Sequence, residues 1–191
     1  QAHEAVLVQA AKAVTPTLIT RAQSVDDGMH TTIIDALGND IISNYHRVNS
    51  LKIRQPQLLA WLDSGRPDIV CLQETKLEDC SFPRLELEAH GYHCTHAGQK
   101  TYNGVALLTR ETTSDVVVGN PLLPDEQMRL LTATVRGTRV VCAYVPNGQA
   151  VGSDKYRYKL AWLEALQRWI SELLSNNPQL IVAGDFNIAP E

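Results

Sequence analysis

Residues 68–76, Asp-Ile-Val-Cys-Leu-Gln-Glu-Thr-Lys, place a short apolar run directly before a group of polar residues. A run of this length and composition is typical of a buried β-strand. The strand would deliver Gln73 and Glu74 to its C-terminal edge, where layered α/β proteins usually expose functional side chains. A carboxylate at that edge can hold Mg²⁺. Taken alone, the motif is more often a solvated Glu at a strand end.

The same arrangement recurs at residues 180–187, Leu-Ile-Val-Ala-Gly-Asp-Phe-Asn. Gly184 permits a sharp exit from the strand. Asp185 can activate a water molecule or protonate a leaving oxygen, and the Asn187 amide can donate to a phosphate oxygen. An Asx-type turn after the strand is an equally good interpretation of this motif by itself.

A third candidate, Tyr144, lies in the apolar run at residues 139–145. Its hydroxyl could point toward a phosphate, or the ring could fill the core with the hydroxyl at its rim. From this stretch alone, core packing is the better interpretation.

From Asp40 onward, short β-branched runs alternate with turns and two helical stretches. One helix is expected at about residues 56–63, with Pro56 in its first turn, and another at about residues 154–174. Besides 69–73 and 180–183, the expected strands are 41–43, 92–95, 105–109, 115–118, 130–135 and 139–145, and the last two form a hairpin through Arg136-Gly137-Thr138. The sequence therefore predicts a layered α/β domain.

Residues 1–38 differ from the rest of the chain. A short helix at Ala5–Ala13 would be stopped by Pro16, and a polar run follows. We expect an N-terminal extension over residues 1–38, to which the sequence assigns no role, and the main domain over residues 39–191.

Charge and cysteine content restrict the functional classes. A formal net charge of −4 argues against a generally basic nucleic-acid coat, so phosphate contacts would need a local basic patch or a metal ion. The four cysteines form no Cys-x-x-Cys pair, and Cys71 and Cys142 lie in apolar runs. No stretch approaches the roughly 18 apolar residues of a membrane span. We therefore expect a soluble, cytoplasmic protein.

Two motifs suggest other sites without supporting them. His93 and His96 have a spacing found in zinc sites, but a strand there would place them on opposite faces. Residues 148–155 resemble a phosphate-binding loop only superficially, because the glycine spacing is one residue short and Lys155 is displaced. Lys155, Arg157 and Lys159 could grip DNA phosphates, although a charged first helical turn is commoner.

The order of the polar motifs is more specific than any one of them. Gln-Glu-Thr-Lys at 73–76, Tyr-Asn-Gly-Val-Ala at 102–106, Tyr-Val-Pro-Asn-Gly at 144–148, Gly-Ser-Asp-Lys at 152–155 and Gly-Asp-Phe-Asn-Ile at 184–188 follow one another. In this order the chain resembles the exodeoxyribonuclease III family of abasic-site nucleases, within the endonuclease/exonuclease/phosphatase superfamily. The resemblance covers about residues 48–191.

That resemblance implies a two-sheet α/β sandwich that uses Mg²⁺ or Mn²⁺. It implies incision of duplex DNA at abasic sites, 3′-to-5′ exonuclease activity from DNA 3′ ends, and a monomer when complete. By the same resemblance, Glu74 would bind the metal, Tyr144 and Asn187 would contact phosphate, and Asp185 would orient water or serve the leaving group. Further candidates are Asn49 for the metal, and Gln73, Asn103 and Lys155 for substrate.

The chain departs from the family pattern in two ways. His46 and Arg47 stand where the family has Trp and a first Asn, while Asn49 matches its second Asn. The family also draws further Asp and Asn groups and a late Asp–His pair from a second half, so we expect a fold incomplete at the C-terminus and no activity from these 191 residues alone. A phosphodiesterase or phosphatase acting on a non-DNA phosphate ester, and a non-catalytic fragment, remain alternatives.

Overall fold

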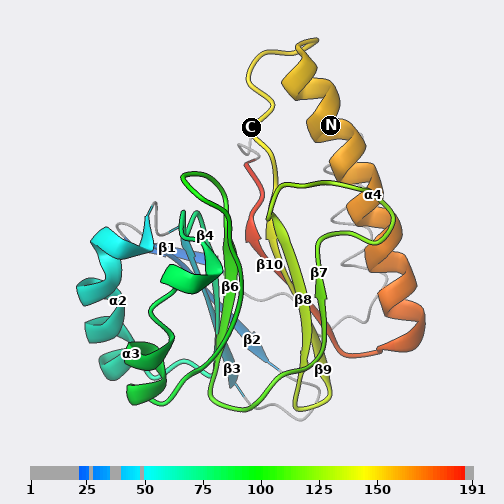
Figure 1. The fold of residues 1–191 in the computed structure, drawn as a ribbon. Helices are drawn as coiled ribbons and strands as arrows, with labels where there is room; N and C mark the ends of the chain where they lie inside the picture. Colours follow the sequence, from blue (N-terminus) through cyan, green and yellow to red (C-terminus); the bar gives the residue numbers. More distant parts are fainter. Residues whose placement is uncertain (1–21, 26–27, 35–39, 48–49, 188–191) are drawn as a thin grey trace.

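Two β-sheets lie face to face in the computed structural model, with helices on their outer sides (Figure 1). The structure describes residues 22–25, 28–34, 40–47 and 50–187, and the side chains discussed below lie in residues 50–187. Helices α2 (Leu51–Gly65) and α3 (Arg84–Ala89) cover one sheet, and α4 (Asp154–Asn176) covers the other. This arrangement confirms the predicted two-sheet α/β sandwich.

The first sheet has the strand order β1-β2-β3-β4-β6-β5. Its strands are β1 (Ala22–Val25), β2 (Gly28–Ile34), β3 (Asp40–Arg47), β4 (Ile69–Gln73), β5 (His93–Ala97) and β6 (Val105–Thr109). β3 and β4 are parallel, and the other neighbours are antiparallel. A 3₁₀ turn, η1 (Asp79–Ser81), lies between β4 and α3.

The second sheet has the order β10-β9-β8-β7. Its strands are β7 (Ser114–Val118), β8 (Leu130–Val135), β9 (Thr138–Tyr144) and β10 (Leu180–Asp185). β8 and β9 form the predicted hairpin, in which Val135 pairs with Thr138 across a two-residue turn. β9 and β10 are parallel, so their C-terminal ends meet at one edge of the sheet.

Side-chain alternation along the strands divides the core into layers. In β4, Val70 and Leu72 pack beneath α2 and α3, whereas Ile69 and Cys71 face the other sheet. In the second sheet, Val141 and Ala143 pack beneath α4, and Val140 and Cys142 face inward between the sheets. Residues of β4 and β9 that continue the inward-facing series therefore converge between the two sheets.

The predicted strands and both predicted helices are present, with two differences in the helices. α2 begins at Leu51, so Pro56 lies inside it rather than in its first turn. Proline there removes one helical hydrogen bond, and the complete burial of Leu51 offsets that loss. The short helix α3 was not predicted, because six residues are too few to show a clear helical period.

The strands β1 and β2 were not predicted either. They fall within residues 1–38, yet β2 pairs with β3 over six residue pairs, from Met29–Tyr45 to Ile34–Asp40. Backbone pairing therefore joins part of the expected N-terminal extension to the first sheet. The predicted helix at Ala5–Ala13 lies outside the described residues.

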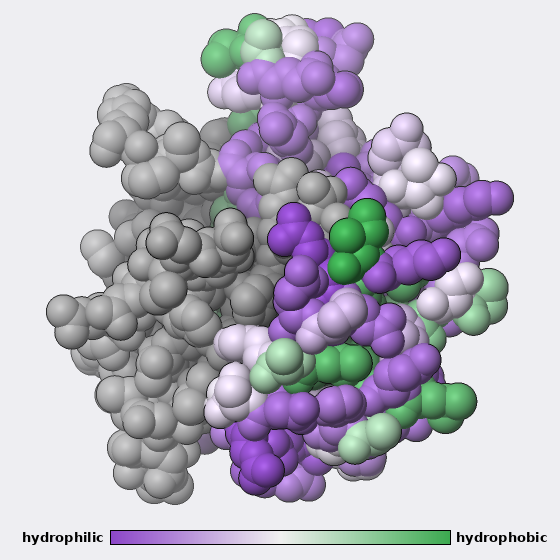
Figure 2. All heavy atoms as spheres, turned by 90° about the vertical axis from the view of Figure 1, so that its left-hand side faces the viewer, coloured by the Kyte–Doolittle hydropathy of each residue, from purple (hydrophilic) through white to green (hydrophobic). Residues whose placement is uncertain are grey.

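The described surface shows no extended apolar area on the face that carries α2 and α3. The coloured part of Figure 2 is largely hydrophilic, with small separate apolar groups. Ile53 of α2 and Leu85 of α3 are among the exposed apolar side chains. Within the described residues, every helix is too short or too polar to cross a bilayer.

Gly184 has a role different from the predicted sharp exit, because the chain stays in β10 through Asp185. Gly184 pairs with Ala143 of β9, and a Cβ atom at Gly184 would lie 1.8 Å from the Ala143 carbonyl oxygen. Only glycine allows β10 to approach β9 this closely. The close approach sets Asp185 directly opposite Tyr144.

Replacing Gly184 with Ala should lower the free energy of unfolding by roughly 2–3 kcal/mol, because the added methyl forces the two strands apart. Denaturant unfolding of the variant checks this. Gly65→Ala is the matched control, since a Cβ atom there would lie at an ordinary 3.6 Å from Trp61 Nε1. Equal stability of Gly184→Ala and the parent chain would contradict the role given to the close approach.

Candidate active site

The C-terminal ends of β4, β9 and β10 meet at one edge of the space between the sheets. Gln73 follows Ile69 and Cys71 on the inward face of β4, and Tyr144 follows Val140 and Cys142 on that of β9. Ala183 packs in the same inter-sheet core, so Asp185, two residues further along β10, belongs to the same face. The two sheets thus bring together residues that are more than 100 positions apart in the chain.

Glu74 is the buried carboxylate of this edge, with 4% of its surface exposed. The Tyr144 hydroxyl donates a hydrogen bond of 2.6 Å to Glu74 Oε1. Lys76 Nζ lies 3.4 Å from the other carboxylate oxygen, Oε2. The Tyr144 bond joins the end of β4 to the end of β9, so two of the predicted site residues are in direct contact.

Asp185 and Asn187 form a second polar group beside the first. Asn187 N donates to Asp185 Oδ1 at 2.9 Å, which is the Asx-type turn considered for this motif. The Asn187 side-chain amide donates to the Val145 carbonyl at 2.8 Å. Lys159 Nζ donates to the Asn187 carbonyl at 2.7 Å. Burial lowers the pKa of Lys159, and the negative charge of Asp185 partly opposes that shift.

Arg129 is a site neighbour that the sequence did not single out. Its guanidinium carbon lies 4.6 Å from the centre of the Tyr144 ring, and Nη1 donates to the Tyr144 carbonyl at 3.4 Å. The signal was present in the sequence. Arg129 directly precedes β8, and the antiparallel pairing of Leu130 with Ala143 brings it opposite Tyr144.

Two predicted substrate-binding residues occupy supporting positions. Gln73 is fully buried, and its amide donates to Cys142 Sγ at 3.3 Å across the two sheets. Asn103 Nδ2 donates to Gln99 Oε1 at 3.0 Å, and the Asn103 carbonyl accepts a bond from Lys76 N. The Gln73 side chain thus links β4 to β9, and the Asn103 backbone, rather than its side chain, bonds the turn that contains Glu74.

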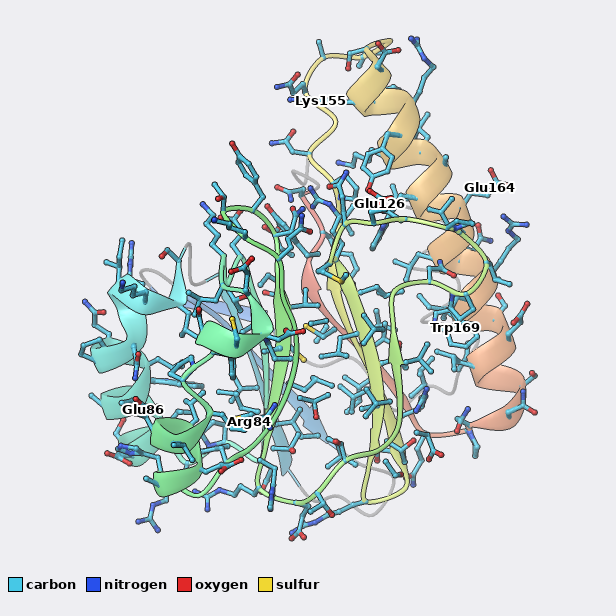
Figure 3. The ribbon with its side chains drawn as sticks, in the orientation of Figure 1. Arg84, Glu86, Glu126, Lys155, Glu164 and Trp169 are labelled. Carbon is cyan, nitrogen blue, oxygen red and sulfur yellow. The ribbon has the colours of Figure 1, made fainter. Side chains whose placement is uncertain are left out.

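Lys155 is separated from this group. It is exposed in the first turn of α4, at the end of the helix that extends beyond the sheets (Figure 3). The Ser153 hydroxyl caps that helix end by accepting a bond from Tyr156 N.

Asn49, the second predicted metal ligand, lies outside the described residues.

His93 and His96 have different surroundings on β5. His93 is exposed, whereas the His96 side chain is buried and its ring stacks on Phe82 with the centroids 4.0 Å apart. His96 Nδ1 lies 2.8 Å from Asp79 Oδ1, and Nε2 lies 3.0 Å from the Thr75 hydroxyl. Burial lowers the pKa of His96 to about 4, although the Asp79 charge opposes the shift. The ring is therefore neutral near pH 7.

This pKa predicts how stability depends on pH. Between pH 6.5 and about 4 the unfolded chain binds a proton at His96 that the folded chain does not, so stability falls as pH falls through that window. The contribution amounts to as much as about 3 kcal/mol. Unfolding measured at pH 7, 5.5 and 4.5 should show a smaller decline for His96→Phe than for the parent chain. His93→Gln is the exposed control, and a decline unchanged in His96→Phe would contradict the prediction.

Positive side chains surround the two carboxylates. Lys76 pairs with Glu74, Arg129 covers Tyr144, and Lys159 binds the turn after Asp185. In a chain with a net charge of −4, these three cations stand close to the two carboxylates of the site. Carboxylates, a phenol and cations together can bind a phosphate ester and move a proton on or off it.

Comparison with known proteins places the chain in a family and supports its fold. Residues 48–191 match the model of the endonuclease/exonuclease/phosphatase family. Exodeoxyribonuclease III of Haemophilus influenzae is 32% identical over 149 residues, which cover 75% of this chain and 56% of that protein.

Two solved structures share the fold. A Neisseria 3′ phosphatase, NExo, bound to a product DNA hairpin has a TM-score of 0.76 and 43% identity. An AP endonuclease from Archaeoglobus fulgidus has a TM-score of 0.75 and 38% identity. Each comparison covers 78% of this chain and 58% of the other, so the chain spans somewhat more than half the length of these relatives. The family match extends over most of the chain, and the chain belongs to the endonuclease/exonuclease/phosphatase family.

Proposed function

We propose that this chain supplies the Glu74 side of the active site of a metal-dependent DNA-repair nuclease, with residues 39–191 as the N-terminal part of its phosphodiesterase domain. The hydrogen bond of 2.6 Å from Tyr144 to Glu74 carries the proposal. It brings a buried carboxylate and a phenol from opposite sheets to one point, beside Asp185.

The donor set around Glu74 suits Mg²⁺ or Mn²⁺. Mg²⁺ prefers oxygen ligands and usually takes one or two carboxylates, filling its remaining positions with water and substrate phosphate. Glu74 offers two carboxylate oxygens, held by Tyr144 and Lys76. In the part of the chain that the structure describes, no group of three or more His, Cys, Asp and Glu side chains could form a closed cage. We assign Glu74 as metal ligand and keep Asn49 as a second candidate. The bound cation would neutralise charge on a phosphate oxygen.

The roles of the other residues follow from their positions. Tyr144 would turn its hydroxyl from Glu74 toward the scissile phosphate, and Arg129 would keep the ring in place. Asp185 would accept a proton from the attacking water or deliver one to the leaving oxygen. Asn187 would bind phosphate, with Lys159 holding its backbone. Gln73 and Asn103 would position Glu74, and Lys155 would contact the DNA backbone away from the reaction.

The proposed substrate is duplex DNA with abasic sites or 3′ ends, cleaved by abasic-site incision and 3′-to-5′ exonuclease action. The Neisseria relative favours a second candidate, removal of phosphate from DNA 3′ ends, since it is described as a 3′ phosphatase. A non-DNA phosphate ester would instead need a pocket for the remainder of that molecule. We further propose a cytoplasmic location, because the buried Cys71, Cys94 and Cys142 are free thiols, as a reducing compartment keeps them. By the family resemblance alone, we also propose a monomer.

We expect activity to need the part of the relatives' length that this chain does not span. Glu74 and its neighbours alone give a metal ion and the transition state few partners. The test compares the 191-residue chain with a full-length protein that contains it. Three duplexes would be offered, carrying an abasic site, a recessed 3′ end or a 3′ phosphate, each with Mg²⁺ or with EDTA. We expect Mg²⁺-dependent cleavage by the full-length protein and none by the 191-residue chain. Cleavage that persists in EDTA, or no reaction with any duplex, would overturn the proposal.

A further inference from the structure

The turn after β4 holds Glu74 in an uncommon backbone conformation. Glu74 and Lys76 have φ angles of 56° and 54°, in the left-handed region that costs a non-glycine residue about 1 kcal/mol or more. The backbone between them is fastened to the loop before β6, by Thr75 N to the Gly104 carbonyl at 3.2 Å and Lys76 N to the Asn103 carbonyl at 3.0 Å. A turn of this kind persists only where its surroundings hold it.

Thr75 lies at the centre of this turn and is fully buried. Its hydroxyl lies 3.0 Å from His96 Nε2 on β5. On its other side, a Cβ atom at Gly104 would come within 2.1 Å of the Thr75 hydroxyl oxygen. The hydroxyl therefore lies close both to the Gly104 backbone and to an imidazole nitrogen.

The His96 ring is itself fixed on its other sides. It stacks on Phe82, and its Nδ1 lies 2.8 Å from Asp79 Oδ1. The same Asp79 oxygen accepts a bond of 2.9 Å from Gly98 N. The Asp79 contact lacks hydrogen-bond geometry, so it acts through its charge: a carboxylate 2.8 Å from Nδ1 favours the neutral tautomer with its proton on Nδ1, which leaves the Nε2 lone pair to accept the Thr75 O–H. Burial, which disfavours the charged ring, supports the same protonation state.

We propose that His96 is a positioning residue for Glu74. Through the Thr75 hydroxyl, His96 and Asp79 hold the left-handed turn that aims the Glu74 carboxylate at Tyr144 and, with it, at a metal ion. This inference rests on the proposed function for the identity of the metal ligand. Residues that orient a ligand from outside its immediate shell typically change metal affinity by about 10- to 100-fold when they are replaced.

Four variants separate positioning through hydrogen bonds from simple packing of the His96 ring. His96→Phe keeps a ring to stack on Phe82 but removes both nitrogen contacts. Thr75→Val keeps the shape of the side chain and removes the hydroxyl, whereas Thr75→Ser restores the hydroxyl. Thr132→Val is the matched control, because Thr132 is a buried threonine whose hydroxyl has no hydrogen-bond partner among the described residues.

The first measurement is Mn²⁺ affinity of the 191-residue chain, taken from paramagnetic broadening of backbone amide signals, which reports millimolar binding. Thr75→Val and His96→Phe should weaken binding by roughly tenfold or more, while Thr75→Ser and Thr132→Val stay close to the parent chain. If Glu74→Gln abolishes Mn²⁺ binding but Thr75→Val and His96→Phe leave the affinity unchanged, the proposal that His96 positions Glu74 is wrong. The assignment of Glu74 as a metal ligand then stands. If Glu74→Gln binds as the parent chain does, the metal assignment of the proposed function is wrong.

A second measurement tests positioning without any metal. Metal-free crystal structures of the parent chain, Thr75→Val and Thr75→Ser report the contact between Glu74 and Tyr144, which is 2.6 Å in the parent structure. We expect Thr75→Val to lose this contact and Thr75→Ser to keep it. A Glu74 carboxylate that stays in place in Thr75→Val would overturn the inference, whatever the metal result.

Discussion

Glu74→Gln should reduce Mg²⁺-dependent cleavage by a full-length protein roughly 10³-fold or more and leave the fold intact. The variant keeps an oxygen that can accept the Tyr144 hydrogen bond but loses the negative charge that holds a cation. A metal ion contributes several kcal/mol of charge stabilisation in the transition state, and about 1.4 kcal/mol corresponds to a factor of ten in rate. Initial rates on an abasic duplex over a range of Mg²⁺ concentrations measure the effect.

The matched control for this variant is Glu86→Gln on α3. Glu86 is exposed on α3, the helix that covers the outer side of the first sheet (Figure 3), so the same chemical change there should leave the rate unaffected. Unfolding of both variants in denaturant separates loss of chemistry from loss of structure. An unchanged rate for Glu74→Gln at saturating Mg²⁺ would remove Glu74 from the metal site.

Asp185→Asn should lower turnover by about 10²- to 10⁴-fold, the range typical of a general acid or base, with little change in DNA affinity. Asparagine keeps the oxygen that accepts the bond from Asn187 N, so the turn after β10 should survive. Single-turnover rates and DNA binding measured on the same preparation separate the two effects. The exposed Asp154 of α4 provides the control, Asp154→Asn.

The opposite pattern would change the role of Asp185. A variant that keeps its single-turnover rate but binds DNA poorly would make Asp185 a DNA-contact or structural residue. In that case Lys159, which lies beside the same turn, would be the next residue to test for proton transfer, because burial already lowers its pKa.

The strands β3 to β10 could be predicted from the sequence because they are local patterns, whereas β1 and β2 could not. The apolar runs at 69–72 and 180–183 are bounded by polar residues, and the structure places strands Ile69–Gln73 and Leu180–Asp185 there. The candidate site was predictable for the same reason, since Glu74 and Asp185 mark the ends of such runs. What the sequence could not show is which strand ends meet, because the packing of β4 against β9 across the two sheets is a property of the folded layers.

The contacts around the site depend on that tertiary arrangement. Arg129 meets Tyr144 through the register of the β8–β9 hairpin, whereas His96 on β5 meets Thr75 in the turn after β4, a contact that does not follow from spacing along the chain. Gln73 and Asn103 remain predicted substrate contacts, and their burial is a feature that their place in motifs did not show. The start of α2 was missed because proline signals a first turn more often than a helix interior.

The central claim is that opposite sheets join Glu74, Tyr144 and Asp185 into one metal-dependent hydrolytic site. Anomalous diffraction from a crystal of this chain soaked in Mn²⁺ tests it most directly. The account predicts one ordered Mn²⁺ at about 2.1 Å from a Glu74 carboxylate oxygen, the distance typical of a small hard cation, on the side of Tyr144 and Asp185. An ordered Mn²⁺ elsewhere, with Glu74 still paired to Lys76, would contradict it.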